Sequence, residues 1–188
     1  MPDLLSYIQT HVDTYEQPGY FILTGSQNLM VSQAVSQTLA GRMAILTLLP
    51  LSANELKEND LLPPSLDIFL CKGGYPRIYA RGVSYLTWYS FYIGMYVERD
   101  VRQISNIHDL SAFCRFLKLC AGRMGQILNI SSLATDCGIS IFAARSWLSL
   151  LEASYIIFLL QPHYKNFSKR LIKSPKLYFF DTGLAVLC

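Results

Sequence analysis

The chain has 188 residues, of which 52% are hydrophobic and 15% are charged, and its formal net charge at pH 7 is +3. This composition excludes an intrinsically disordered chain, because so many apolar side chains can form a substantial core. The apolar runs are far shorter than the roughly 20 residues of a membrane-spanning helix, so we expect neither a transmembrane segment nor a membrane partner.

The cysteines and histidines show none of the spacings that are typical of metal sites or disulfide frameworks. The five cysteines are odd in number and lack a C-x-x-C pair, and the three histidines lie apart from them. Free thiols of this kind are typical of a reducing compartment. We therefore expect a cytoplasmic protein without a metal site.

Two apolar segments near the N-terminus predict buried strands. Residues 20–24 and residues 42–52 carry apolar runs without alternation, which indicates strands that are covered on both faces. A helix predicted for residues 28–40 lies between them, and this order is typical of the βαβ units of parallel sheets. Two such strands alone would leave edges and faces open. We expect the missing strands to come from upstream sequence or from a partner chain, or to be lost by truncation.

Three local signals mark helix ends in the same region. Residues 3–15 place apolar side chains at helical spacing, which predicts a first helix. Gly41 follows the second helix at the position that favours a left-handed cap. Ser52 and Glu55 form a capping box, which predicts a short helix directly after the second strand.

After residue 60 the sequence predicts a mostly helical region. A tight turn at Gly73–Pro76 precedes a long amphipathic stretch over residues 81–104, and the next helix is predicted for residues 109–126. We interpret an aromatic stripe on the amphipathic stretch as core. The stripe consists of Tyr85, Trp88, Tyr89 and Tyr92.

Residues 130–153 carry the pattern of a helix-turn-helix. Ser131 or Ser132 can cap the first helix, and Gly138 lies four residues after a small alanine, so the two helices can cross closely. Ser140 is the expected cap of the second helix. This second helix carries the apolar side chains of Phe142, Ala144, Trp147, Leu148 and Leu151.

Two further apolar segments, "SYIIFLL" and "KLYFF", predict a pair of strands that flank a basic strip. The strip, Gln161–Lys176, contains five basic residues and no acid, whereas the rest of the chain is mildly acidic. This arrangement over about residues 155–180 is typical of a β-wing behind a recognition helix. The basic residues of the strip are Lys165, Lys169, Arg170, Lys173 and Lys176.

Several short motifs occur together in a characteristic order: "FILTGSQN", "LAGR", "LPLS" followed by "EL", "GGYP", "YVERDV", the helix-turn-helix, and "KSPKLYFFDTGL". In this order they resemble a bacterial and archaeal family of predicted AAA-type P-loop ATPases with a C-terminal winged-helix domain of unknown function, DUF4143. The resemblance implies an α/β fragment over residues 1–60, the C-terminal βαβ part of a P-loop ATPase domain. It implies a mostly helical winged-helix domain over residues 61–188.

The phosphate-binding loop of that family has no counterpart in this sequence. No G-x-x-x-x-G-K-[ST] motif occurs, so the β- and γ-phosphates of ATP lack their amide cradle and lysine. We therefore expect an N-terminally truncated member that needs no cofactor by itself and does not hydrolyse ATP, whereas intact relatives use ATP and Mg²⁺. A further hypothesis is an active ATPase that a frameshift has split.

The resemblance also implies a remnant of the nucleotide site. Ser26 and Gln27 match the sensor strand, where one of them would bind the γ-phosphate or its attacking water. Arg42 matches an arginine that faces nucleotide, as an arginine finger does. Two structural alternatives stay open, because Ser26 can cap the following helix and Arg42 can interact with a helix C-terminus.

The winged-helix part suggests two kinds of partner. Arg145 is the one cation on the predicted recognition helix, beside Ser140, Ser146 and Ser149, and the basic strip could contact DNA phosphates. The alternative is a non-enzymatic module that docks onto another protein, such as the missing ATPase half. Asp181 lacks a neighbouring acid or histidine, and we expect it to cap the last helix.

Overall fold

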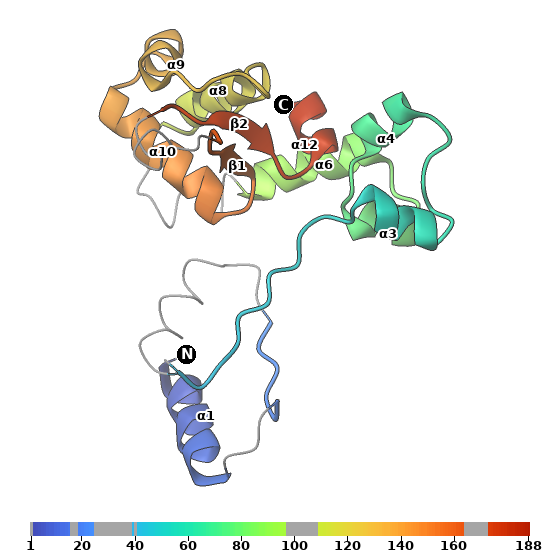
Figure 1. Ribbon diagram of the computed structural model, residues 1–188, viewed down its shortest axis with the longest axis vertical. Helices are drawn as coiled ribbons and strands as arrows, with labels where there is room; N and C mark the ends of the chain where they lie inside the picture. Colours follow the sequence, from blue (N-terminus) through green and yellow to red (C-terminus); the bar gives the residue numbers. More distant parts are fainter. Residues whose placement is uncertain (1, 16–18, 25–38, 40, 97–108, 164–172) are drawn as a thin grey trace. The chain divides into compact units, whose positions relative to one another are not determined.

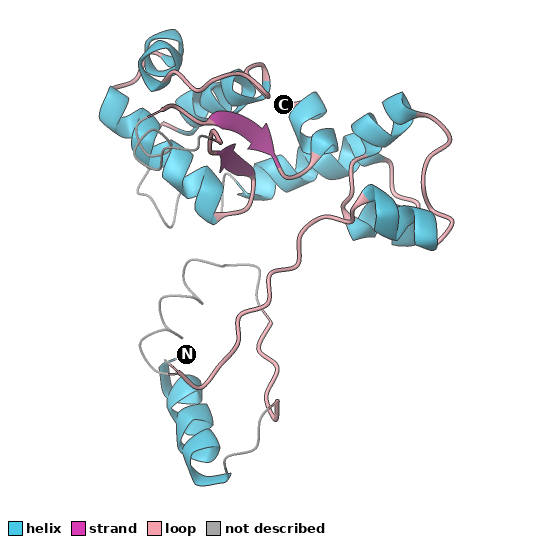
Figure 2. Cartoon of the chain, in the orientation of Figure 1, coloured by secondary structure: helices cyan, strands magenta, loops and turns pink. Residues whose placement is uncertain are grey.

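The computed structural model describes residues 2–15, 19–24, 39, 41–96, 109–163 and 173–188 (Figure 1). The chain forms two compact units, Met1–Leu48 and Leu49–Cys188. The described residues are mostly helical, and the one sheet among them is antiparallel and has two strands (Figure 2).

The first unit contains helix α1 (Pro2–Tyr15). Ile8 is buried in a small cluster with Leu39, and the partly buried Leu5 and Val12 pack against this pair. These residues of α1 repeat every three or four positions, which is the spacing that predicted the helix. Gly41 has a φ of 77°, the left-handed conformation expected after a helix.

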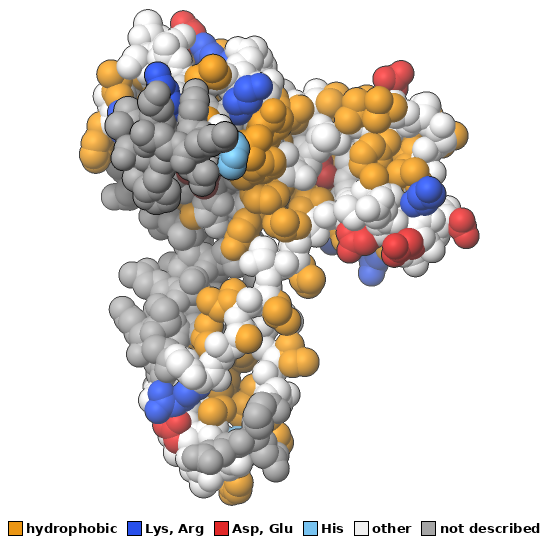
Figure 3. Space-filling view, in the orientation of Figure 1, with side chains coloured by type: hydrophobic (Ala, Val, Ile, Leu, Met, Phe, Trp, Pro, Cys, Tyr) orange, Lys and Arg blue, Asp and Glu red, His pale blue; other side chains and the backbone are white. Residues whose placement is uncertain are grey.

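The two segments that were predicted as buried strands do not form strands. Residues 21–24 and 43–49 are loops (Figure 2), and their apolar side chains are exposed, Ile22 to 86% and Leu48 to 96%. A strand needs a neighbour for its backbone groups, and the described residues of this unit provide none. Hydrophobic side chains consequently lie on the surface of the unit (Figure 3). The helix predicted for residues 28–40 lies outside the described residues, except for Leu39.

The second unit begins with a series of short helices. The Ser52 hydroxyl accepts from the backbone N–H of Glu55 at 3.2 Å, and the Glu55 carboxylate accepts from the N–H of Ser52 at 2.8 Å, so the predicted capping box is present. The hydrogen bonds that the backbone N–H and the hydroxyl of Ser52 donate to the Glu55 carboxylate lower the pKa of Glu55. The amphipathic stretch predicted from residue 81 becomes helical only at Tyr85. The helices are α3 (Ala53–Glu58), α4 (Leu66–Lys72), α5 (Pro76–Ala80) and α6 (Tyr85–Met95).

The aromatic stripe of α6 is partly core. Tyr89 is fully buried, and its ring packs edge-on against Tyr75 and Trp88. Trp88 and Tyr92 are half-buried and stack on one another, with ring centroids 5.0 Å apart. The hydroxyl of Tyr75 donates to that of Tyr92 at 3.1 Å. The stripe therefore fixes the turn at Gly73–Pro76 against α6.

The remainder of the second unit surrounds the small sheet. Strands β1 (Ile157–Leu160) and β2 (Lys176–Phe179) are antiparallel, with Ile157 opposite Phe179 and Leu160 opposite Lys176. The predicted pair of strands on either side of the basic strip is thus present. In Figure 1 helices α8 and α9 lie above the two strands and α10 lies to their left, and α12 follows β2 in the chain. Their bounds are α8 (Leu110–Ala121), α9 (Ile130–Cys137), α10 (Ile141–Ala153) and α12 (Thr182–Leu187).

A third extended segment runs along the free edge of β2. The N–H of Gly125 donates to the carbonyl of Leu177 at 2.7 Å, and the N–H of Leu128 donates to that of Pro175 at 2.8 Å. An isolated bridge pairs Ile127 with Lys176 in the antiparallel sense. Strand β2 consequently lies between β1 and the segment that joins α8 to α9.

The core of this region lies between α8, α10 and the sheet. Trp147 of α10 packs edge-on against Phe113 and Phe116 of α8, with ring centroids 5.3 Å apart in both pairs. Phe142 of the same helix does not belong to this core, because its side chain is 84% exposed. A helix turns by about 100° per residue, so Phe142 and Trp147 point in directions about 140° apart and cannot both face the core.

Helix α12 packs against both the early and the late elements of the second unit. It packs against α4 and α6 on one side and against α8 and β2 on the other. Among the described residues, no helix is long and apolar enough to cross a membrane. No group of His, Cys, Asp or Glu within the same residues is arranged to hold a metal ion.

Candidate nucleic-acid interface

Helices α9 and α10 meet through a tight turn at Gly138. Gly138 has a φ of 74° and a ψ of 33°, the left-handed conformation that glycine adopts most readily. The next N–H, of Ile139, donates to the carbonyl of Ala134 at 3.0 Å. Ala134 is buried, so its small side chain lets the helices approach closely. The Ser140 hydroxyl then accepts from the N–H of Ala143 at 3.0 Å and caps α10, as predicted.

The start of α9 differs from the prediction by two or three residues. Its cap is Asn129, whose side chain accepts from the N–H of Ser132 at 3.0 Å. Ser131 and Ser132 therefore lie inside the helix rather than at its cap. An asparagine is as good an N-cap as a serine, so the sequence alone offered no means to choose between them.

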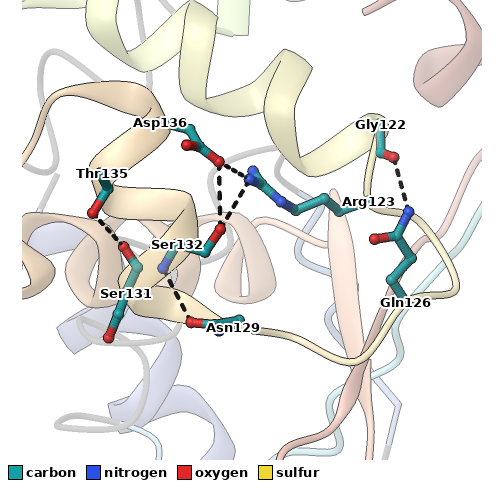
Figure 4. A network of polar contacts seen from close by, with 8 residues as sticks. All are labelled: Gly122, Arg123, Gln126, Asn129, Ser131, Ser132, Thr135 and Asp136. Carbon is teal, nitrogen blue, oxygen red and sulfur yellow. Dashed lines mark hydrogen bonds and ion pairs between the residues drawn. The ribbon is translucent and has the colours of Figure 1, made fainter.

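A polar network holds α9 against the end of α8 (Figure 4). Arg123, in the turn after α8, forms an ion pair with Asp136 of α9, and Ser132 donates to the same carboxylate at 3.4 Å. One terminal nitrogen of Arg123 is buried without a hydrogen-bond partner among the described residues. The network fixes the orientation of α9, and the sequence analysis did not anticipate it.

One face of α10 is exposed from Phe142 to Ser149. Phe142, Arg145, Ser146 and Ser149 are all exposed, and they occur at the spacing i, i+3, i+4 and i+7 that places side chains on one helix face. The opposite face is buried and includes Trp147. The residues predicted to read DNA from α10, apart from its cap, therefore share one accessible surface, which we call the α10 face.

Of the basic residues predicted to contact DNA, those in the described part of the chain are exposed. Lys173 and Lys176 are exposed before and at the start of β2, and Arg145 is exposed on α10. Lys165, Lys169 and Arg170 lie outside the described residues. Strand β1, which pairs with β2, begins four residues after the end of α10.

The residues predicted from the nucleotide site are only partly described. Ser26 and Gln27 lie outside the described residues. Arg42 forms an ion pair with Asp13 of α1, and its N–H donates to the carbonyl of Leu39 at 3.0 Å. The ion pair to Asp13 was not foreseen. It joins α1 to the segment that follows Gly41.

Asp181 is buried at the junction between β2 and α12, with 2% of its surface exposed. One carboxylate oxygen accepts from the N–H of Leu184 at 2.8 Å, which confirms the predicted helix cap. The same oxygen accepts from the Tyr89 hydroxyl at 2.6 Å, and the second oxygen accepts from the N–H of Gly74 at 2.7 Å. Asp181 thus has three donors from three parts of the chain, so we interpret it as structural.

At this junction the backbone of Gly73 lies very close to the side chains of Tyr89 and Asp181. Gly73 has a φ of 63°, and a Cβ atom there would lie 2.1 Å from the Tyr89 hydroxyl and 2.5 Å from a carboxylate oxygen of Asp181. The N–H of Leu51 donates to the carbonyl of Gly74 at 2.7 Å, so the entry segment of the unit is held at the same place. Burial and the adjacent Asp181 raise the pKa of Tyr89, which keeps the phenol protonated as a donor. The glycine pair in "GGYP" was the sequence signal for this contact.

These features define a mostly helical domain that carries a tight helix-turn-helix and a small antiparallel sheet. Residues 64–187 match the family described as "Domain of unknown function (DUF8612)", and the chain belongs to this family. This family, DUF8612, is not the DUF4143 family that the sequence motifs resemble. Residues 1–57 match the family described as "AAA domain", so this part is similar to a region of AAA-type ATPases.

Two curated relatives cover nearly the whole chain. They are uncharacterized proteins of Mycobacterium bovis and Mycobacterium tuberculosis, each 27% identical over 186 residues. The match covers 98% of this chain but 41% of each relative, so the chain spans about two fifths of their length. No solved structure matches the chain.

The end of the AAA match and the end of the first compact unit do not coincide. The AAA match extends to residue 57, whereas the first unit ends at Leu48. The intervening residues contain most of α3, whose Leu56 is completely buried. The last part of the AAA region is therefore packed within the second unit.

Proposed function

We propose that the chain is part of an AAA-type ATPase and joins a piece of the ATPase region to a winged-helix domain that binds duplex DNA. The observation that carries this proposal is the order of elements in residues 109–180. Helix α8 is followed by an extended segment, then α9, α10, β1 and β2, and β2 pairs with both β1 and the extended segment. A helix-turn-helix followed by such a hairpin is the arrangement of a winged helix.

The charges on the exposed surface favour DNA as the partner. In helix-turn-helix proteins the second helix enters the major groove, and here that helix is α10. The α10 face carries Arg145 and no acid, and the one acid of α10, Glu152, is half-buried. Lys173 and Lys176 add exposed positive charge at the hairpin, where a wing would contact the phosphate backbone.

We propose that the ATPase region acts only together with the rest of an AAA domain. The chain lacks a G-x-x-x-x-G-K-[ST] loop, so this proposal assigns it no ATP hydrolysis of its own. Residues 20–24 and 43–49 are apolar and exposed, which suits strands that complete a sheet with the rest of an AAA domain. In such an assembly, which would bind ATP and Mg²⁺, Ser26 and Arg42 are the residues that we place toward the nucleotide.

Binding to duplex DNA is expected to depend steeply on salt, and the hairpin lysines are expected to contribute to that dependence. Fluorescence anisotropy with a labelled duplex of mixed sequence, measured at several salt concentrations, gives the slope of log K against log salt. The double variant K173E/K176E is expected to reduce the magnitude of this slope by about 2. Each phosphate contact that is lost lowers the number of counterions released from the DNA on binding by about one.

Lys57→Glu is the matched control, because Lys57 is also an exposed lysine, on α3, and lies outside the proposed interface. This variant is expected to bind like the unmodified chain. Absence of binding at low salt, or binding that does not change with salt, would contradict the proposal.

A protein-docking role is the second candidate, and the exposure of Phe142 favours it. A large exposed apolar side chain is typical of a protein interface. A chain that bound no duplex at low salt, but self-associated in sedimentation experiments until Phe142 was replaced by arginine, would support this function instead.

A further inference from the structure

We propose that Phe142 reads the thymine methyl group in the major groove and is a specificity-determining residue of this chain. The proposal rests on the DNA-binding function proposed above and extends it from phosphate contacts to base contacts. It starts from a large apolar side chain outside the core, since Phe142 is 84% exposed on the side of α10 opposite its buried face.

The position of Phe142 along α10 suits a base contact. It is the second residue of the helix, directly after the Ser140 cap and Ile141. The N-terminal residues of a recognition helix are the ones that contact base edges, because this end of the helix lies deepest in the groove. An exposed side chain here projects toward the bases rather than toward the phosphates.

The fold also prevents Phe142 from turning inward. Trp147 occupies the inward direction and packs against Phe113 and Phe116. Rotating α10 to bury Phe142 would bring Trp147 out of this cluster, since the two side chains point about 140° apart. The exposure of Phe142 is therefore set by the packing of the opposite face.

The chemistry of the ring limits what it can recognise. An aromatic hydrocarbon forms no hydrogen bonds with base edges, and the C5-methyl group of thymine is the apolar group that the major groove presents. Arg145 lies one turn further along the same face, about 4.5 Å along the helix axis. Its guanidinium can bind guanine O6 and N7 or a phosphate. This pairing of an apolar and a cationic side chain is complementary to DNA in both polarity and charge.

The test compares two alternating duplexes that differ only in the methyl group, poly(dA-dT) and poly(dA-dU). The unmodified chain is expected to bind the thymine duplex about fourfold more tightly per methyl contacted, the value of one buried methyl group. Phe142→Ala is expected to bind both duplexes equally and to keep the salt slope of the unmodified chain. Phe142→Leu, which stays apolar, is expected to retain a preference for thymine.

Leu66→Ala is the matched control, because Leu66 is an exposed apolar residue on α4, outside the α10 face. It is expected to keep the thymine preference. Salt-dependent binding with equal affinity for the two duplexes would overturn the role of Phe142 and leave the proposed function in place. Equal loss of both duplexes in a folded Phe142→Ala variant would also overturn it. Absence of DNA binding by the unmodified chain would overturn both proposals.

Discussion

Replacing Asp181 by alanine is expected to lower the free energy of unfolding by about 4 kcal/mol. The carboxylate accepts hydrogen bonds from Tyr89, Gly74 and Leu184. Its removal leaves the N–H groups of Gly74 and Leu184 without this acceptor, and the Tyr89 hydroxyl keeps only the Lys72 carbonyl, 3.1 Å away. A buried donor that loses its partner costs its full desolvation energy, which is larger than the net value of the hydrogen bond. Urea unfolding followed by far-UV circular dichroism measures the difference.

Two further variants identify the cause of this loss. Asp181→Asn is expected to cost roughly half as much, because the amide keeps one acceptor oxygen but presents an N–H group where a carboxylate oxygen accepts. Asp67→Ala removes an exposed acid from the first turn of α4 and is expected to change stability by less than about 1 kcal/mol. Asp181→Ala with an unfolding midpoint equal to that of the unmodified chain would exclude a structural role for Asp181.

Replacing Gly73 by alanine is expected to be at least as damaging, with a loss of about 4 kcal/mol or more. The Cβ atom would lie 2.1 Å from the Tyr89 hydroxyl and 2.5 Å from an Asp181 oxygen, so one of these buried groups must move and break its hydrogen bond. The backbone adds a second cost, because a φ of 63° is unfavourable for alanine. Thermal unfolding of the purified variant provides the measurement.

Gly82→Ala separates the two costs. Gly82 also has a positive φ, of 58°, but no atom lies within 4 Å of the position that a Cβ would take. Its replacement is therefore expected to cost only the backbone term, about 1 kcal/mol. Similar losses at Gly73 and Gly82 would mean that the close approach to Tyr89 and Asp181 does not limit stability.

Sequence patterns predicted the elements whose signals are local. The capping box at Ser52, the turn at Gly138 and the cap at Ser140 each depend on residues within three or four positions, and the structure contains all three. The antiparallel pair β1 and β2 was predicted from two apolar segments around a basic strip. The hydrogen bonds of helix caps join residues a few positions apart, so they depend mainly on the local sequence and can be predicted from it.

The features that sequence analysis missed depend on partners far along the chain. Asp181 and Gly74 are 107 residues apart, and no local pattern indicates that one hydrogen-bonds the other. Residues 20–24 and 43–49 have the composition of strands, but a strand also requires a neighbour to pair with. Sequence analysis did not separate Phe142 from the other apolar residues of α10, although it lies only two positions from Ala144, which is buried on the opposite side of the helix.

The most direct test of the account is a map of the surface that contacts DNA. Two-dimensional amide NMR spectra of the full chain, recorded during titration with a duplex, report which residues change their environment. The account predicts that the largest changes occur in residues 141–149 and 173–176, with the amides of α3 and α4 unchanged. Changes confined to α3 and α4, or no change at low salt, would contradict the claim that α10 and the hairpin form a DNA-binding surface.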